Sequence, residues 1–312
     1  MTDAVEIKSH VIRVAREADM DLVGIAAVDR FESVHYRLRP QAHLPDARAV
    51  VSMAMRYPRA MYELAGVTEA ESNMSLDSYE NSHMREMLMV AAMDVTRYLE
   101  KCGWLAVPMQ ITHYRVHPYK DIPDSWTRDF DHNVAAVAAG LGELGLHGEP
   151  ITPEYGTRQM FISVVTDAPL EPDPIYDGPP LCDRCMKCVE TCHMKAFDPS
   201  TRKTVTIGER TFEVAAKDIW RCMWSRRFML NADAGPRLCG LDVTVDPPDG
   251  PITEADVQKA QALKGEKGGM QTWYIYADRA CERNCIPPHH RGRQRRTDTQ
   301  PHQAAGAAEG QA

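Results

Sequence analysis

Four cysteines within eleven residues constrain this chain more than any other feature of its sequence. The run from Cys182 to Cys192, "CDRCMKCVETC", has the spacing C-x2-C-x2-C-x3-C. This spacing is typical of chains that bind iron–sulfur clusters. Zinc sites usually use two separated C-x2-C pairs, so the dense run favours iron–sulfur ligation over zinc.

The cysteine count matches two clusters. The chain has nine cysteines, and Cys102, alone at the end of a predicted helix, is interpreted as structural. Eight thiolates are what two [4Fe–4S] clusters need, and in two-cluster ferredoxins the fourth cysteine of such a run binds the other cluster. We therefore predict that cluster one is bound by Cys182, Cys185 and Cys188, and that Cys192 belongs to cluster two.

The remaining four cysteines are spaced irregularly. The segment after Cys239 looks like a second ferredoxin run in which Asp242 and Asp246 replace cysteines. We expect the downstream pair, Cys281 and Cys285, to supply the two missing thiolates. In this interpretation Cys222, Cys239 and Cys281 complete cluster two, and Cys285 closes cluster one. The alternatives are that cluster two is missing, is a [3Fe–4S] cluster or has an aspartate ligand.

Composition restricts the class of protein. The net charge of −8 counts against a broad nucleic-acid-binding surface. No stretch approaches eighteen apolar residues, so no membrane span is expected. The N-terminus has no apolar signal core and resembles an amphipathic helix, which predicts a cytoplasmic protein. In a reducing compartment, nine cysteines favour metal or redox work over disulfides.

Hydrophobic patterns predict a mixed helix and strand fold, α+β in class. The predicted strands are residues 21–28, 48–55 and 161–167, and the predicted helices are residues 82–101 and 132–142. Prolines in residues 167–180 predict a linker. We expect a corrinoid- and substrate-binding core over residues 1–170, an iron–sulfur domain over residues 171–288 and a disordered tail over residues 289–312.

The expectation that residues 1–170 bind a corrinoid rests on a resemblance to two known protein families. The segment "AAGLGELGLHGEPITPEYGTRQMFISVVTDAPLEPDPI", followed by the cysteine run, closely resembles reductive dehalogenases and is similar, less closely, to epoxyqueuosine reductases. The resemblance implies an α/β sandwich: a nitroreductase-like corrinoid-binding core joined to a ferredoxin-like domain with two [4Fe–4S] clusters. This chain departs from both families at His193, where they have proline, and at the two aspartates after Cys239.

The resemblance also implies site residues. Its corrinoid-lining segments correspond here to Gly140, Gly142, Thr152, Glu154, Tyr155, Gly156 and Arg158. Glycines allow backbone to approach a flat ligand, and the polar residues can hydrogen-bond it. The absence of a D-x-H-x2-G motif fits base-off cobalamin. Dehalogenases use a tyrosine acid with a basic neighbour, so the candidates for proton donation are Tyr119 with Lys120 and, second, Tyr114.

Together these features predict an oxidoreductase. We expect an external donor, a ferredoxin, flavodoxin or reductase, to pass electrons through two clusters to cobalamin, which reductively cleaves a C–X or C–O bond of a small molecule. One alternative is an electron-transfer or corrinoid accessory protein without its own catalysis. A second is an epoxyqueuosine reductase-like enzyme that modifies tRNA.

Overall fold

A four-stranded antiparallel sheet forms the centre of the fold. The computed structural model describes residues 4–59, 83–111, 115–116, 126–127, 130–228, 245–266 and 280–291. The strands are β1 (Leu22–Ala27), β2 (Ala49–Arg56), β8 (Gln159–Thr166) and β3 (Ala106–Met109), in the order β1-β2-β8-β3. Every residue of β8 is buried, so the sheet has a covered layer on each side.

Two long helices cover one face of the sheet. They are α1 (Ala4–Glu17) and α5 (Arg85–Lys101), and they contact each other. Val11 of α1 and Leu88 of α5 are fully buried in one cluster with Val51 of β2. Apolar residues at helical spacing therefore meet alternate residues of the strands, as an amphipathic helix on a sheet requires.

The other face packs against shorter elements. These are α6 (His132–Ala138), α2 (Pro40–His43) and the 3-10 helices η1 (Val28–Phe31) and η2 (Tyr36–Leu38). On this face Val50 of β2 and Val165 of β8 pack with Val137 of α6 in a second hydrophobic cluster. The adjacent strand residues, Val51 and Val164, belong to the cluster on the first face. Between α6 and β8 lie two short strands, β6 (Glu143–Leu144) and β7 (Pro150–Ile151), paired antiparallel. Another short pair is β4 (Arg115–Val116) with β5 (Trp126–Thr127).

A long hairpin links the sheet to the cysteine region. Its strands are β9 (Phe197–Ile207) and β10 (Arg210–Lys217), with Gly208 in the turn at φ +53°. Ile207, Phe212 and Val214 lie in the same hydrophobic cluster as α6. The predicted core and the predicted iron–sulfur region therefore share buried surface.

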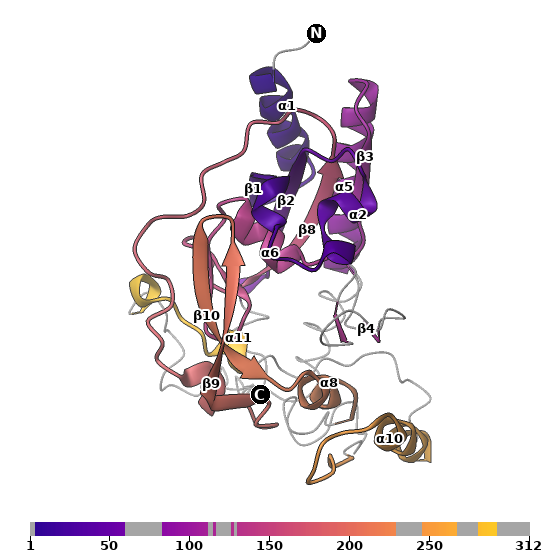
Figure 1. The fold of residues 1–312 in the computed structure, drawn as a ribbon, viewed down its shortest axis with the longest axis vertical. Coiled ribbons are helices and arrows are strands. Elements are labelled where there is room, and N and C mark those ends of the chain that lie inside the picture. Colours follow the sequence, from indigo (N-terminus) through magenta and orange to yellow (C-terminus); the bar gives the residue numbers. More distant parts are fainter. Residues whose placement is uncertain are drawn as a thin grey trace, which may run out of the picture.

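The cysteine region consists of short helices around this hairpin. They are α7 (Lys187–Glu190), α8 (Ile219–Phe228), α10 (Glu254–Glu266), α11 (Ala280–Arg283) and the 3-10 helix η4 (Pro288–His290). Figure 1 shows the sheet in the upper half of the view, with α8 and α10 at the opposite end and the hairpin between them. Within the described ranges, no helix has the length and apolar character needed to cross a membrane.

The predicted strands and the mixed fold are confirmed, with three differences. The predicted helix over residues 132–142 ends at Ala138 because Gly140 adopts φ +76°. The predicted linker over residues 167–180 is held in place: Asp173 accepts a hydrogen bond from Ile25 N–H at 2.8 Å and pairs with Lys8 at 2.6 Å. The predicted tail begins with ordered residues, because η4 extends to His290.

Candidate metal centre

The loop that carries the first three cysteines has an unusual backbone. Arg184 and Met186 adopt φ of +57° and +63°, the left-handed region that non-glycine residues rarely enter. Left-handed residues alternating with right-handed ones turn successive N–H groups to one side, a concave arrangement found around phosphates and iron–sulfur clusters. Such backbone costs about 1–3 kcal/mol per residue and persists at functional sites. The loop conformation thus matches the ligation that the cysteine spacing predicts.

A buried carboxylate holds the start of this loop. Glu143, on β6, is 8% exposed, and its Oε1 accepts hydrogen bonds from the backbone N–H groups of Leu181 and Cys182, each at 2.7 Å. Two charge-assisted hydrogen bonds to one oxygen fix where the run begins. Glu143 is therefore a positioning residue for Cys182.

Two cysteine sulfurs receive hydrogen bonds from backbone. Leu146 N–H donates to Cys182 Sγ, and Ala196 N–H donates to Cys192 Sγ, both at 3.4 Å. Donors to ligand sulfur stabilise the thiolate and raise the potential of an iron–sulfur cluster. The contacts involve one cysteine predicted for each cluster.

The structure brings Cys285 to the first run. The charges of Cys182, Cys188 and Cys185 act on Cys285, where burial, the larger cause, also raises the pKa of the thiol. The pKa of Cys188 is raised to about 11 by burial and then by the neighbouring Cys182. Four thiols therefore lie together here, as the ligands of one metal cluster would.

Three contacts fix the segment that carries Cys285. Arg291 makes a two-pronged ion pair with Asp183, within the run, including an Nη2–Oδ1 hydrogen bond of 2.9 Å. The Thr157 hydroxyl donates to the carbonyl oxygen of Glu282 at 2.8 Å, and α11 contacts α7. The ordered structure of residues 280–291 therefore depends on the cysteine run and on the turn after β7.

The other described cysteines form a second group. Cys192 packs against two hydrophobic clusters. One also contacts Cys222, and the other, which contains Cys188, also contacts Cys182 and Cys281. Burial raises the pKa of Cys281 well above its ordinary value, with the charges of Glu282 and Cys222 adding to the effect. Cys239 lies outside the described residues. The grouping of Cys192, Cys222 and Cys281 corresponds to three of the four predicted ligands of cluster two.

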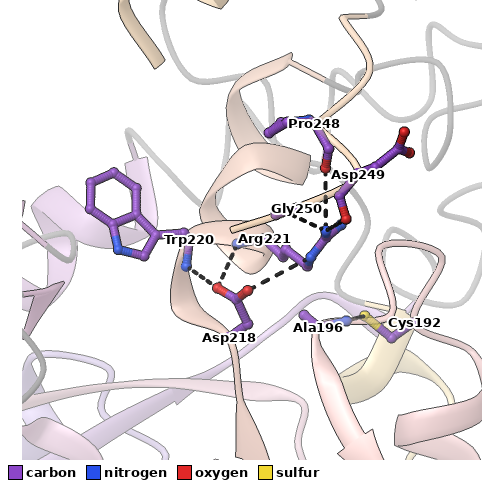
Figure 2. A network of polar contacts seen from close by, with 8 residues as sticks. All are labelled: Cys192, Ala196, Asp218, Trp220, Arg221, Pro248, Asp249 and Gly250. Carbon is purple, nitrogen blue, oxygen red and sulfur yellow. Dashed lines mark hydrogen bonds and ion pairs between the residues drawn. The ribbon is translucent and has the colours of Figure 1, made fainter. Parts of the chain in front are cut away.

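The N-terminus of α8, the helix that carries Cys222, is hydrogen-bonded to the segment that follows Cys192. Figure 2 shows the polar contacts at this end of the helix. Asp218 Oδ1 accepts from the N–H groups of Trp220 and Arg221 at 2.9 and 3.1 Å, an N-cap for the helix. Asp218 N–H donates at 2.7 Å to the carbonyl oxygen of Ala196, whose own N–H donates to Cys192 Sγ. Cys222 N–H in turn donates to the carbonyl oxygen of Asp218 at 3.1 Å, so three successive hydrogen bonds connect the two cysteines.

Arg221 holds the same helix to the segment before α10. Its Nη2 donates to the carbonyl oxygens of residues 248–250 at 3.2–3.3 Å, which Figure 2 shows as converging contacts. Trp224 Nε1 donates to the carbonyl oxygen of Val245 at 2.7 Å. These contacts hold the helix that carries Cys222 against residues 245–250.

The described side chains do not form a site for a single metal ion. Over the part of the chain that the structure describes, no group of three His, Cys, Asp or Glu side chains could hold one metal ion. In a cubane each cysteine binds a different iron, so iron and sulfide separate the cysteine sulfurs more widely than a mononuclear site does.

The predicted corrinoid residues lie on the turn after β7 and at the end of α6, but their glycines serve the chain itself. A Cβ on Gly140 would overlap the carbonyl oxygen of Pro174, and one on Gly142 would overlap the carbonyl oxygen of Ile151. A Cβ on Gly156, which adopts φ +64°, would lie 3.0 Å from the Pro287 ring. The chain's own packing therefore already requires these glycines, and their contact with a corrinoid stays a prediction.

The polar members of that set differ in exposure. Thr152 is fully buried, and its hydroxyl donates to Gln159 Oε1 at 3.2 Å and accepts from Tyr155 N–H. Glu154 is exposed, and Tyr155 and Arg158 are half-buried. These last three are the predicted corrinoid residues whose side chains reach the surface.

The candidate proton donors Tyr114, Tyr119 and Lys120 lie outside the described residues. A cavity of about 620 Å³ lies beside η1 and the hairpin turn, with Asp29, Glu32, Thr206 and Glu209 in its lining. It contains none of the predicted site residues.

The sequence is similar to those of two kinds of enzyme. Over 228 residues the chain is 30% identical to a tetrachloroethene reductive dehalogenase of Sulfurospirillum multivorans, covering 68% of this chain and 43% of the relative. Over 209 residues it is 25% identical to an epoxyqueuosine reductase of Bacillus subtilis, covering 60% of this chain and 50% of the relative. No protein-family model matches the chain. The chain belongs to the superfamily of reductive dehalogenases and epoxyqueuosine reductases.

Structural similarity supports the fold of this superfamily. A solved reductive dehalogenase, described for B12-dependent dehalogenation, superimposes with a TM-score of 0.52 at 16% identity, covering 86% of this chain and 35% of that one. The chain spans half the length or less of these superfamily members.

Two features near the cysteines were not predicted from the sequence, the buried carboxylate of Glu143 and an ion pair. Glu143 sits between two buried apolar stretches, and a carboxylate in such a place needs a partner, which is the signal that was available. Lys217 and Glu149 form an ion pair at 3.4 Å, with side chains 19% and 17% exposed. Nothing in their sequence spacing indicates that pairing.

We expect Gly142→Ala to lower the free energy of unfolding by about 3 kcal/mol, because its Cβ meets backbone that cannot rotate away. Chemical denaturation measures the loss. Gly250→Ala is the matched control, because nothing lies within 4 Å of the added Cβ. A Gly142 variant as stable as the Gly250 variant would contradict the packing role of this glycine.

Proposed function

We propose that this chain is a reductase that passes electrons through two [4Fe–4S] clusters to a bound corrinoid and reductively cleaves a carbon–halogen or carbon–oxygen bond. The observation that carries the iron–sulfur part is the grouping of distant cysteines. Cys285 lies with the first three cysteines of the run, and Cys281 lies with Cys192 and Cys222. Two sets of thiols, each gathered from separate segments, support two clusters over one.

The chain's own residues support the proposed cluster sites in distinct ways. The left-handed residues Arg184 and Met186 shape a loop around cluster one, and Glu143 anchors its start. Backbone donors reach one sulfur in each set. Burial excludes water, which strengthens each of these interactions.

The corrinoid part rests on the relatives. When bound, cobalamin supplies a low-valent cobalt, a strong reductant and nucleophile. We assign contact with it to Glu154, Tyr155 and Arg158, whose side chains reach the surface. In the overall reaction two electrons from a one-electron donor protein and one proton convert C–X to C–H and release the halide. Tyr119 with Lys120, or Tyr114, is proposed to deliver the proton.

A second candidate is reduction of an epoxide carried on tRNA. The 25% identity with an epoxyqueuosine reductase, over 60% of this chain, favours it as strongly as the dehalogenase similarity favours the first. The net charge of −8 is unfavourable for broad nucleic-acid contact, but it does not exclude a localised contact with a tRNA stem loop.

One anaerobic preparation tests these proposals. Iron and sulfide are counted per chain, cobalamin is added, and its absorption spectrum reports base-off binding. About eight iron per chain with base-off cobalamin supports the reductase. Eight iron without cobalamin uptake supports an electron carrier, and four or fewer contradicts the two-cluster assignment. Tetrachloroethene and an epoxyqueuosine-modified tRNA stem loop, supplied separately with reductant, then distinguish the two substrate classes.

A further inference from the structure

A half-buried lysine and glutamate lie beside the second group of cysteines. Lys217 Nζ is 3.4 Å from Glu149 Oε1 and 3.5 Å from the carbonyl oxygen of His147. It also lies 5.7 Å from the centre of the Phe197 ring. Phe197 belongs to the hydrophobic cluster that packs against Cys281. The ammonium group is therefore held next to the cysteine region and mostly out of water.

The hairpin is irregular at the point where it places this lysine. The strand pairing shifts between Ala215 and Lys217, and beyond the shift Lys217 lies opposite Phe197. The extra residues are on β9, where the Asp198 carboxylate accepts from the N–H groups of Ser200 and Thr201 at 2.8 and 3.2 Å. Irregularities of this kind re-aim side chains near functional sites.

Opposite charges are thus placed at the side-chain cluster that Cys281 packs against. Lys217 lies over the Phe197 ring of that cluster, and Glu149 is paired with Lys217. Glu149 is held on its other side by the side-chain amide of Asn133, on α6. Because the pair is half-buried, solvent screens its field less than that of a fully exposed pair.

We propose that Lys217 and Glu149 are opposed positioning residues that set the reduction potential of cluster two. This inference rests on the proposed function, because it requires that Cys281 bind a cluster. Reduction adds one negative charge to the cluster, which a nearby ammonium stabilises and a nearby carboxylate destabilises. Lys217 raises the potential, Glu149 lowers it, and together they keep it within reach of the donor.

Potentiometric titration monitored by electron paramagnetic resonance, on the reconstituted full chain, tests this. We expect Lys217→Met to lower the midpoint potential of one cluster and Glu149→Gln to raise the potential of the same cluster. The double variant should return close to the parent value. Lys203→Met removes the same charge from an exposed position of β9 and should leave both potentials unchanged.

The outcomes separate this inference from the proposed function. Clusters present with unshifted potentials in both variants, or shifted in the same direction in both, would overturn the charge role. A shared shift would mean only that the pair supports the fold. A parent chain that binds no cluster under reconstitution would overturn the proposed function and this inference together.

Discussion

Cys285→Ser is expected to remove one cluster and lower the iron content from about eight to about four per chain. Cys285 lies with Cys182, Cys185 and Cys188, so the lost cluster should be cluster one. Cys281→Ser should remove the other cluster. Iron and sulfide analysis of anaerobically reconstituted protein, with electron paramagnetic resonance of the reduced state, measures both losses.

Paired substitutions test the grouping itself. Adding Cys188→Ser to Cys285→Ser should cost no further iron, because both residues are assigned to one cluster. Combining Cys285→Ser with Cys281→Ser should abolish both clusters. Cys102→Ser is the control, because Cys102 is exposed at the end of α5, on the sheet side of the molecule. Full iron in the Cys285 and Cys281 variants would show that the downstream pair is not used.

Sequence patterns predicted the elements whose burial is uniform. β2 and β8 are apolar along their length and buried almost throughout, so a run of hydrophobic residues identifies them without ambiguity. The cysteine run was equally clear because its spacing is short and its chemistry is particular. Each of these signals is contained within a single short stretch of the chain.

The β9–β10 hairpin was missed for the opposite reason. β9 has charged and hydroxyl residues and a proline near its start, and most of its positions are at least partly exposed. A strand of this kind is stabilised by its partner and by contacts with α6, and neither is visible in local periodicity. The position of Lys217 depends on the pairing of this hairpin, so the sequence alone could not predict that position.

The glycines show a different limit. Gly140 and Gly142 were predicted to line a ligand, and the structure shows that each also meets a carbonyl group of the chain itself. A bound macrocycle and a packed carbonyl impose the same requirement, the absence of a Cβ. Only the coordinates of Pro174 and Ile151 distinguish the two, and those residues are brought there by tertiary contacts.

Glu143→Ala is expected to destabilise the start of the cysteine run. The change leaves the N–H groups of Leu181 and Cys182 without their acceptor in a buried position. An unsatisfied buried donor costs about 1–3 kcal/mol, so a loss of about 3 kcal/mol in the free energy of unfolding is expected. The rate at which a chelator removes iron should rise at the same time, because Cys182 is no longer fixed.

Glu143→Gln separates hydrogen bonding from charge. The glutamine oxygen can still accept from both N–H groups, so stability should fall by only about 1 kcal/mol, the difference between a charged and a neutral acceptor. Removing a buried negative charge next to cluster one should also raise the potential of that cluster. Glu154→Ala, at an exposed position, controls for loss of a glutamate from the same region. Iron retention in Glu143→Ala equal to that of the Glu154 variant would mean that Cys182 is held by the cluster and the loop backbone alone.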